Sequence, residues 1–290
     1  MNPGSDEDSL VLAQEVISLP TNKKREFYHY LNNPELIPTL EKEPQSIDTW
    51  ISHTLADAYL ERPPIEYVVN GLFKLPSLNI MYAAPGNFKS YILADLAICV
   101  SSGKPWLEPA PWEDEGEAIP TKQCTVMWLD FDNGIDETHE RFEYLGRGHD
   151  LNVDSSKLVY YSMPSPWLDA SKLEHIGELS KRIKNNDARL VIIDNLGVVS
   201  GGIDENSNQM VQVMSNFRRL AEETRAAIVI IHHQRKGTIT NSRVGDSLRG
   251  HSSIEAAINI ALRIDREPYD NTVKIELPSR CTCHFGLLFC

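Results

Sequence analysis

Residues 78–90 read LNIMYAAPGNFKS, and this stretch decides how the rest of the chain is interpreted. It opens with the apolar residues of a buried strand, turns at Ala84-Pro85-Gly86, and continues into KSYILADLAICV, which has the apolar pattern of a helix. Strand, tight loop and helix in this order bring backbone N–H groups and a helix N-terminus to one point. That arrangement binds phosphate groups.

The pair Lys89-Ser90 completes a nucleotide-binding P-loop, G-x-x-x-x-G-K-[ST]. In this motif the lysine contacts the terminal phosphates and the serine hydroxyl contacts Mg²⁺. Ala83 and Phe88 occupy the two glycine positions of the consensus, where glycine allows positive φ and close backbone approach. The alternative is a helix N-terminus that carries Lys-Ser by chance. The predicted nucleotide-binding residues here are Ala84, Pro85, Gly86, Asn87, Phe88, Lys89, Ser90 and Tyr91.

Length and charge set limits on the class of protein. With 290 residues and 41% hydrophobic content, the chain can form one large α/β domain and a smaller appendage. The 28 basic and 41 acidic residues give a net charge of −13, which excludes a protein that coats nucleic acid with its whole surface. Any contact with nucleic acid must come from a local basic patch or from a pore formed by several subunits.

The cysteines and the hydropathy pattern indicate a cytoplasmic protein. Cys99 and Cys124 lie within apolar patterns and are expected to be buried free thiols. A zinc site at 281–284 (CTCH) is disfavoured because the paired spacing of structural zinc sites is missing. With no run of 18 apolar residues and no charged-then-apolar leader, neither a membrane span nor secretion is expected.

Residues 1–62 differ in character from the rest of the chain. They are polar, acidic and interrupted by prolines, and a helix is expected over 47–61 before Pro63-Pro64. This segment is predicted to be a helical N-terminal appendage or linker, with a solvated, partly disordered leader as the alternative. Residues 63–290 then form the main domain.

From residue 65 onward, apolar runs alternate with amphipathic helical patterns. Runs such as ARLVIID (188–194) and AAIVIIHH (226–233) are apolar on both faces, which is typical of central parallel strands covered by helices. The final strands are expected over 254–264 and 271–277. The sequence therefore predicts an α/β domain with a mostly parallel sheet flanked by helices.

Several of these strands end in polar side chains that would share one sheet edge with the P-loop. Asp194 ends its strand in the Walker B arrangement and would hold Mg²⁺ together with Ser90. Asp130 and Asp132 follow the strand at 124–130, and either could orient the attacking water. The alternatives are a strand that ends in aspartate at a turn, and an Asx-turn with solvent-facing acids.

The strand at 226–233 ends in three residues that could contact the γ-phosphate, namely His232, His233 and Gln234. The loop that follows is the densest basic segment of an acidic chain, and we predict that it contacts the DNA backbone. A solvated surface loop is the alternative. The basic residues of this loop are Arg235, Lys236, Arg243 and Arg249.

The segments AAPGNFKS, WLDFDNG, LVIIDN, IVIIHHQRKG and SLRGHSSIEAAINIALRIDR together resemble the RecA-like P-loop ATPase fold. The resemblance is to the branch of plasmid RepA-like and DnaB-like hexameric replicative helicases, from about Pro64 to the C-terminus. It implies that Lys89 and Ser90 bind phosphates and Mg²⁺ and that Asp194 is the Walker B acid. It also implies that Asp132, one methylene shorter than the family's glutamate, activates water.

The resemblance further implies an oligomer, most simply a hexameric ring, with ATP and Mg²⁺ at subunit interfaces. Arg280 would reach into the neighbour's ATP site, His232 to Gln234 would sense the γ-phosphate, and the basic loop would contact single-stranded DNA. Residues 1–62 could bind a replication partner. The chain also stops soon after Arg280, where related sequences usually continue.

The resemblance implies a helicase or helicase-like motor of a plasmid, phage or mobile element. Two alternatives stay open at this point. One is a KaiC-like assembly module with weak turnover, which the altered P-loop and the short Asp132 would favour. The other is a filament-forming recombination or repair ATPase, which uses the same type of subunit interface.

Overall fold

The computed structural model describes residues 52–109, 116–204, 207–233, 252–266 and 273–277. The chain divides into two compact units, Met1–Arg62 and Pro63–Cys290. Because most of the first unit lies outside the described residues, its assignment as a helical appendage stays a prediction.

The described part of the first unit holds one helical turn, α3 (Leu55–Ala58). Thr54 starts it, because its hydroxyl accepts from the Asp57 backbone N–H at 3.4 Å while the Asp57 carboxylate accepts from the Thr54 N–H at 2.7 Å. The helix expected over 47–61 is therefore wrong for residues 52–54 and 59–61, which are not helical. This capping box and the prolines at 63 and 64 confine the helix to a few residues.

The second unit is built on a seven-stranded sheet with the order β5-β4-β6-β7-β3-β8-β9. All neighbouring strands are parallel except β8 and β9, which are antiparallel. The predicted α/β class with a mostly parallel sheet is confirmed. A separate antiparallel pair, β1 (Tyr67–Val69) and β2 (Phe73–Lys74), precedes it. The strands of the large sheet are β3 (Ser77–Ala83), β4 (Thr125–Asp130), β5 (Leu158–Ser162), β6 (Ala188–Asp194), β7 (Ala227–His233), β8 (Ile260–Asp265) and β9 (Lys274–Glu276).

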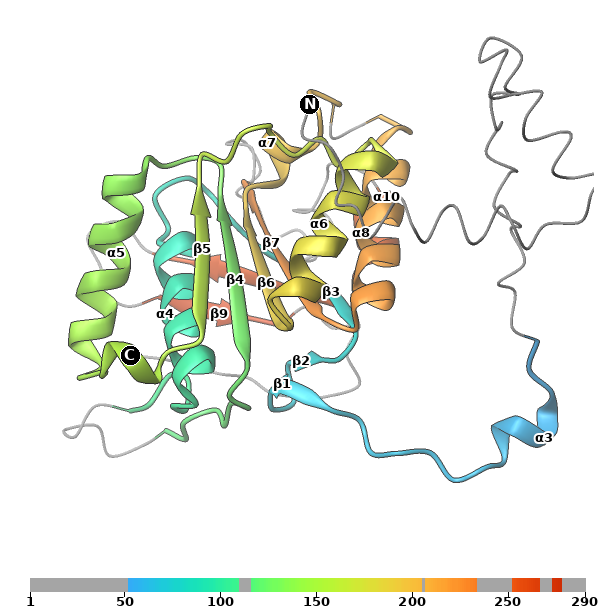
Figure 1. Cartoon of the computed structure of the whole chain (residues 1–290), viewed down its shortest axis with the longest axis horizontal. Helices are drawn as coiled ribbons and strands as arrows, with labels where there is room; N and C mark the ends of the chain where they lie inside the picture. Colours follow the sequence, from blue (N-terminus) through green and yellow to red (C-terminus); the bar gives the residue numbers. More distant parts are fainter. Residues whose placement is uncertain (1–51, 110–115, 205–206, 234–251, 267–272, 278–290) are drawn as a thin grey trace, which may run out of the picture. The chain divides into compact units, whose positions relative to one another are not determined.

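Helices cover both faces of this sheet. Helices α4 and α5 pack together on one face, and α6, α8 and α10 pack together on the other (Figure 1). No helix among the described residues is long and apolar enough to cross a membrane. The helical elements are α4 (Lys89–Ser102), α5 (Ile135–Gly148), the 3₁₀ turn η2 (Val153–Ser155), α6 (Leu173–Asn185), α7 (Leu196–Val199), α8 (Met210–Thr224) and α10 (Ser252–Ala257).

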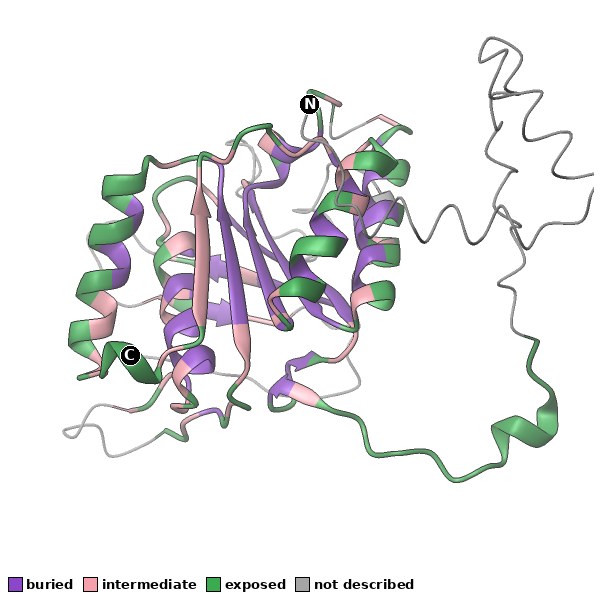
Figure 2. Ribbon diagram, viewed as in Figure 1, coloured by how far each residue is buried: buried purple, intermediate pink, exposed green. Residues whose placement is uncertain are grey.

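The two helical layers bury both faces of the central strands (Figure 2). In β6, Leu190 and Ile192 belong to the core under α4, whereas Val191 and Ile193 belong to the core under α6 and α8. Continuous apolar runs are therefore required in the middle of the sheet. Polar side chains of these strands are left to the strand ends, and this places the site described below.

The strand expected over 254–264 is only partly correct. Residues up to Ala257 form the end of α10, and β8 starts at Ile260. Glu255, Ala256 and Ala257 favour a helix, and Asn259 then fixes the start of the strand. Its amide oxygen accepts from the Leu78 N–H at 2.9 Å, and its own N–H donates to the Leu78 carbonyl at 2.7 Å.

Candidate nucleotide-binding site

The loop between β3 and α4 has the conformation that a phosphate-binding loop needs. Two of its residues adopt positive φ, Gly86 at 83° and Phe88 at 55°. Phe88 precedes the first turn of α4, and its carbonyl accepts the first helical hydrogen bond from Ile92 at 2.9 Å. The backbone thus reaches the left-handed conformation at position 88 without glycine, which costs on the order of 1 kcal/mol.

Lys89 occupies the centre of this loop and is 4% exposed. Its Nζ donates to the carbonyls of Ala83 at 3.0 Å and Ala84 at 2.9 Å. Burial lowers the pKa of the ammonium, and the Asp194 carboxylate opposes that shift. The lysine is thus held inside the loop by bonds to neutral carbonyls, which a charged phosphate can replace.

Ser90 and Asp194 meet at the carboxyl edge of the sheet. The Ser90 hydroxyl donates to Asp194 Oδ2 at 2.6 Å, although 104 residues separate them. Burial raises the pKa of the Asp194 carboxyl to about 6, and Asp130 and Asp132 also raise it, whereas the Ser90 hydrogen bond and Arg141 lower it. The structure thus brings the predicted P-loop serine and the predicted Walker B acid into direct contact.

These two residues fit a Mg²⁺ ion. Asp194 is 1% exposed, and within the described residues its Oδ1 has no hydrogen-bond partner. A buried carboxylate oxygen without a donor is costly unless a cation or water serves it. Ser90 and Asp194 would hold Mg²⁺, which in nucleotide hydrolases neutralises charge on the phosphate oxygens.

The two acids after β4 have different environments. Asp130 is fully buried and accepts from the backbone N–H groups of Asp132 at 3.0 Å and Asn133 at 2.8 Å. It also accepts from the Thr138 hydroxyl at 3.2 Å and pairs with Arg141 at 3.5 Å. The Asp132 side chain is half exposed. Asp130 therefore holds the turn, and Asp132 is left to face the site.

This contrast predicts different effects on stability. We expect Asp130→Ala to lower the free energy of unfolding by about 3 kcal/mol, because it removes a buried acceptor and leaves the Arg141 guanidinium unpaired. Asp132→Ala should change that free energy by less than about 0.5 kcal/mol, as exposed positions usually do. Urea unfolding of both variants measures the difference, and equal losses would show that Asp130 is not the anchor.

Asp132, Asp194 and His233 form one cluster at the strand ends. One donor atom from each lies within 4.8 Å of the others, and His233 Nε2 lies 3.9 Å from Asp132 Oδ2. Strand register produces this closeness, because Asp130 pairs with Asp194 and Ala83 pairs with His233 across the sheet. The sheet thus aligns the ends of β3, β4, β6 and β7 at one level.

The two histidines are neutral at physiological pH. Burial lowers the pKa of His232 to about 4, and His233 and Lys89 act in the same direction. Burial and Lys89 also lower the pKa of His233, whereas Asp132 raises it. Neutral rings beside Lys89 can donate a hydrogen bond to phosphate without adding charge. Their predicted role as γ-phosphate sensors stays a prediction.

Aromatic and guanidinium groups surround the start of α4, and the sequence did not indicate this arrangement. The Arg266 guanidinium lies 4.3 Å from the Phe88 ring centre, and Arg141 lies 5.0 Å from the Tyr91 ring centre. Phe88 and Tyr91 are 44% and 47% exposed. The spacing of Thr138 and Arg141 on one helix could have suggested a contact with the preceding strand end, whereas no local pattern indicates Arg266.

Phe88→Gly is expected to preserve nucleotide binding. Glycine removes the left-handed strain of about 1 kcal/mol, and the lost contact with Arg266 costs about 0.5–1 kcal/mol. The free energy of unfolding should therefore change by less than about 1 kcal/mol. Calorimetric titration with an ATP analogue checks this, and complete loss of affinity would show that residues 84–90 do not form the binding loop.

Some predicted site residues lie outside the described part of the chain, so their positions stay predictions. They are Gln234, Arg235, Lys236, Arg243, Arg249 and Arg280.

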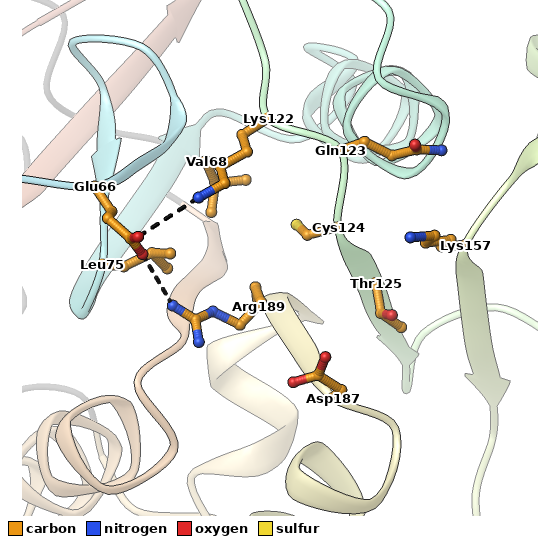
Figure 3. A pocket seen from close by; sticks show the side chains of 10 residues that line it. All are labelled: Glu66, Val68, Leu75, Lys122, Gln123, Cys124, Thr125, Lys157, Asp187 and Arg189. Carbon is orange, nitrogen blue, oxygen red and sulfur yellow. Dashed lines mark hydrogen bonds and ion pairs between the residues drawn. The ribbon is translucent and has the colours of Figure 1, made fainter.

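A second pocket, with a volume of about 320 Å³, lies at the opposite ends of β4, β5 and β6 (Figure 3). Glu66 on its rim pairs with Lys122 at 3.5 Å and with Arg189 at 3.3 Å. Thr125 and Arg189 lie at the starts of their strands, whereas Asp130 and Asp194 lie at the ends. This pocket is therefore separate from the nucleotide-binding site.

Comparisons with known proteins agree with this geometry. The family model described as an AAA domain matches residues 42–238, which include the P-loop and all the described acids and histidines of the site. No curated protein matches the chain.

Two solved structures resemble the model. The ATPase domain of a DnaB-like helicase has a TM-score of 0.51 and 12% identity over 70% of this chain and 76% of that one. The RadB recombinase has a TM-score of 0.52 and 16% identity over 74% of this chain and 86% of that one. These similarities confirm the predicted RecA-like fold, which DnaB-like helicases share. The chain belongs to the AAA domain family and is a RecA-like P-loop ATPase.

Proposed function

We propose that this ATPase is Mg²⁺-dependent and acts on single-stranded DNA, as a replicative helicase or helicase-like motor of a plasmid, phage or other mobile element. The observation that carries the proposal is the hydrogen bond of 2.6 Å between Ser90 and Asp194, beside the buried Lys89. Phosphate binding, metal binding and a carboxylate for the attacking water are thus available at one sheet edge.

Asp132 is the group we propose to orient the attacking water. It is the exposed member of the cluster with Asp194 and His233, whereas Asp130 is occupied by the turn. Its carboxylate is one methylene shorter than the glutamate of related ATPases, so slow turnover is expected. A neutral His233 at 3.9 Å can hold Asp132 in place.

The proposal includes partners. We propose a homo-oligomer, most simply a hexameric ring in the cytoplasm, in which Arg280 of one subunit completes the ATP site of the next. Arg235, Lys236, Arg243 and Arg249 would contact the DNA backbone, and residues 1–62 would serve a replication partner. Contacts with phosphates predict binding that weakens steeply with salt.

Single-stranded DNA should raise the rate of ATP hydrolysis, and Asp132→Ala should lower that rate by about 10²-fold or more while nucleotide binding is retained. Phosphate release at increasing concentrations of an oligonucleotide measures both effects. Asp136→Ala serves as the matched control, because Asp136 is also exposed and lies in the first turn of α5. Turnover that ignores single-stranded DNA would contradict the proposal and favour a weakly hydrolysing assembly module.

A recombination ATPase is the second candidate, because the RadB recombinase resembles the chain about as closely as the helicase ATPase domain does. Rings and filaments use the same heterologous contact and differ in closure. Electron microscopy with ATP and single-stranded DNA distinguishes them, since closed rings support the helicase and long filaments support the recombinase.

A further inference from the structure

Three side chains with different metal-binding atoms meet between α4 and α5, away from the nucleotide-binding loop. They are Asp95, Cys99 and His149, and one ligand atom from each lies within 4.8 Å of the others. Asp95 and Cys99 are four residues apart on α4 and therefore lie on one face of that helix. His149 is the residue that ends α5.

Both neighbours of His149 contact the same ring nitrogen. Nε2 lies 2.6 Å from Asp95 Oδ1 and 3.8 Å from Cys99 Sγ. A catalytic relay needs the carboxylate and the thiol on different ring nitrogens, so that one orients the ring and the other exchanges a proton. This cluster has the opposite arrangement, because its three atoms converge on one point. Convergence on one point is the arrangement of metal ligands.

The backbone holds the three side chains in place without a metal. Asp95 and Cys99 project from a long helix, and the His149 N–H donates to the Leu145 carbonyl at 3.0 Å. Lys104 donates to the His149 carbonyl at 2.6 Å and fixes the end of α5 against α4. A site carried by rigid elements loses little entropy when it binds an ion.

Access and charge suit a cation. The Asp95 and His149 side chains are each 26% exposed, so an ion can enter, whereas Cys99 is fully buried beneath them. The charged groups that act on the thiol are Asp95, Glu108 and Lys104. Two of the three are acidic, so the local charge is negative even before the thiol ionises.

We propose that Asp95, Cys99 and His149 form a zinc site, with water as the fourth ligand. Thiolate, imidazole and carboxylate are the ligands that Zn²⁺ prefers. On binding, the Cys99 thiol releases its proton to solvent, and the imidazole coordinates through Nε2 with its proton on Nδ1. Zn²⁺ would then join α4, which begins at the nucleotide-binding loop, to the end of α5.

Cobalt(II) substitution tests this site, because a Co²⁺–thiolate bond produces a charge-transfer absorption band in the near ultraviolet. The candidate Mg²⁺ residues, Ser90 and Asp194, offer only oxygen atoms and produce no such band. We expect one Co²⁺ per chain to give the band and one Zn²⁺ to abolish it. Cys99→Ser should remove the band, whereas Cys124→Ser, the matched control, should retain it.

The C-terminal cysteines require a second background. The full-length chain with Cys281, Cys283 and Cys290 all changed to serine should keep the band, and adding Cys99→Ser should remove it. In the same background, Zn²⁺ should raise the thermal midpoint only when Cys99 is present. A band lost with the C-terminal cysteines, a band that survives Cys99→Ser, or no band at all would each overturn the proposal. Circular dichroism without metal confirms that each variant is folded.

Discussion

Lys89→Ala is expected to lower the rate of ATP hydrolysis by a factor on the order of 10²–10³. Nζ is buried in the loop within 3.0 Å of the carbonyls of Ala83 and Ala84, at the place where phosphate oxygens would bind. Alanine removes the positive charge that stabilises the transferring phosphoryl group. Phosphate release with and without single-stranded DNA measures the loss, and binding of an ATP analogue reports ground-state affinity.

Lys104→Ala is the matched control for this variant. Lys104 also donates to a backbone carbonyl, that of His149 at 2.6 Å, but it follows the C-terminal end of α4. We expect hydrolysis to be unchanged in this variant. If Lys89→Ala keeps its DNA-stimulated activity, the assignment of residues 84–90 as the nucleotide-binding loop is wrong.

Asp194→Asn is expected to abolish Mg²⁺-dependent hydrolysis and, at the same time, to stabilise the fold at high pH. Burial raises the pKa of this carboxyl from 3.8 to about 6, so the folded chain holds a costly buried charge above pH 6. The folded state binds the proton more tightly than the unfolded state does. Stability therefore falls as the pH rises from about 4 to about 6.

Asparagine removes this penalty, so the free energy of unfolding at pH 8 should rise on the order of 2 kcal/mol and lose part of its pH dependence. In the unsubstituted chain, kcat/KM should decline as the pH falls through about 6, because a protonated Asp194 cannot hold Mg²⁺. Urea unfolding at pH 5 and pH 8 and a pH–rate profile measure the two effects. Asp132→Asn, at a half-exposed position, should leave stability unchanged, and a destabilised Asp194→Asn would show that its charge is compensated.

The sheet could be predicted from sequence because its signal is local and repeated. Runs such as 188–194 are apolar on both faces, and the strand found there has the predicted ends. The placement of Asp194 near Ser90 also followed, since parallel strands end at one edge. Local pattern was misleading at 254–264, where a hydrogen bond between Asn259 and Leu78, 181 residues apart, decides where the strand begins.

The candidate site was harder to predict in detail than the fold. Asp130 and Asp132 are equivalent as sequence, and their difference comes from Thr138 and Arg141, which occupy one acid and leave the other exposed. The contact between Arg266 and Phe88 joins distant parts of the chain and has no local signal. The cluster around His149 was missed because Cys99 lies in an apolar pattern that indicates only a buried thiol.

The hydrogen bonds of Lys89 to Ala83 and Ala84 have a consequence for the protein without nucleotide. Since the loop supplies partners for its own lysine, it does not depend on a phosphate group to keep its shape. ATP must displace these internal acceptors, so part of the attraction between lysine and phosphate is spent on the exchange. The loop should then give similar amide hydrogen-exchange protection with and without nucleotide, and the chain should be stable enough to assemble before ATP arrives.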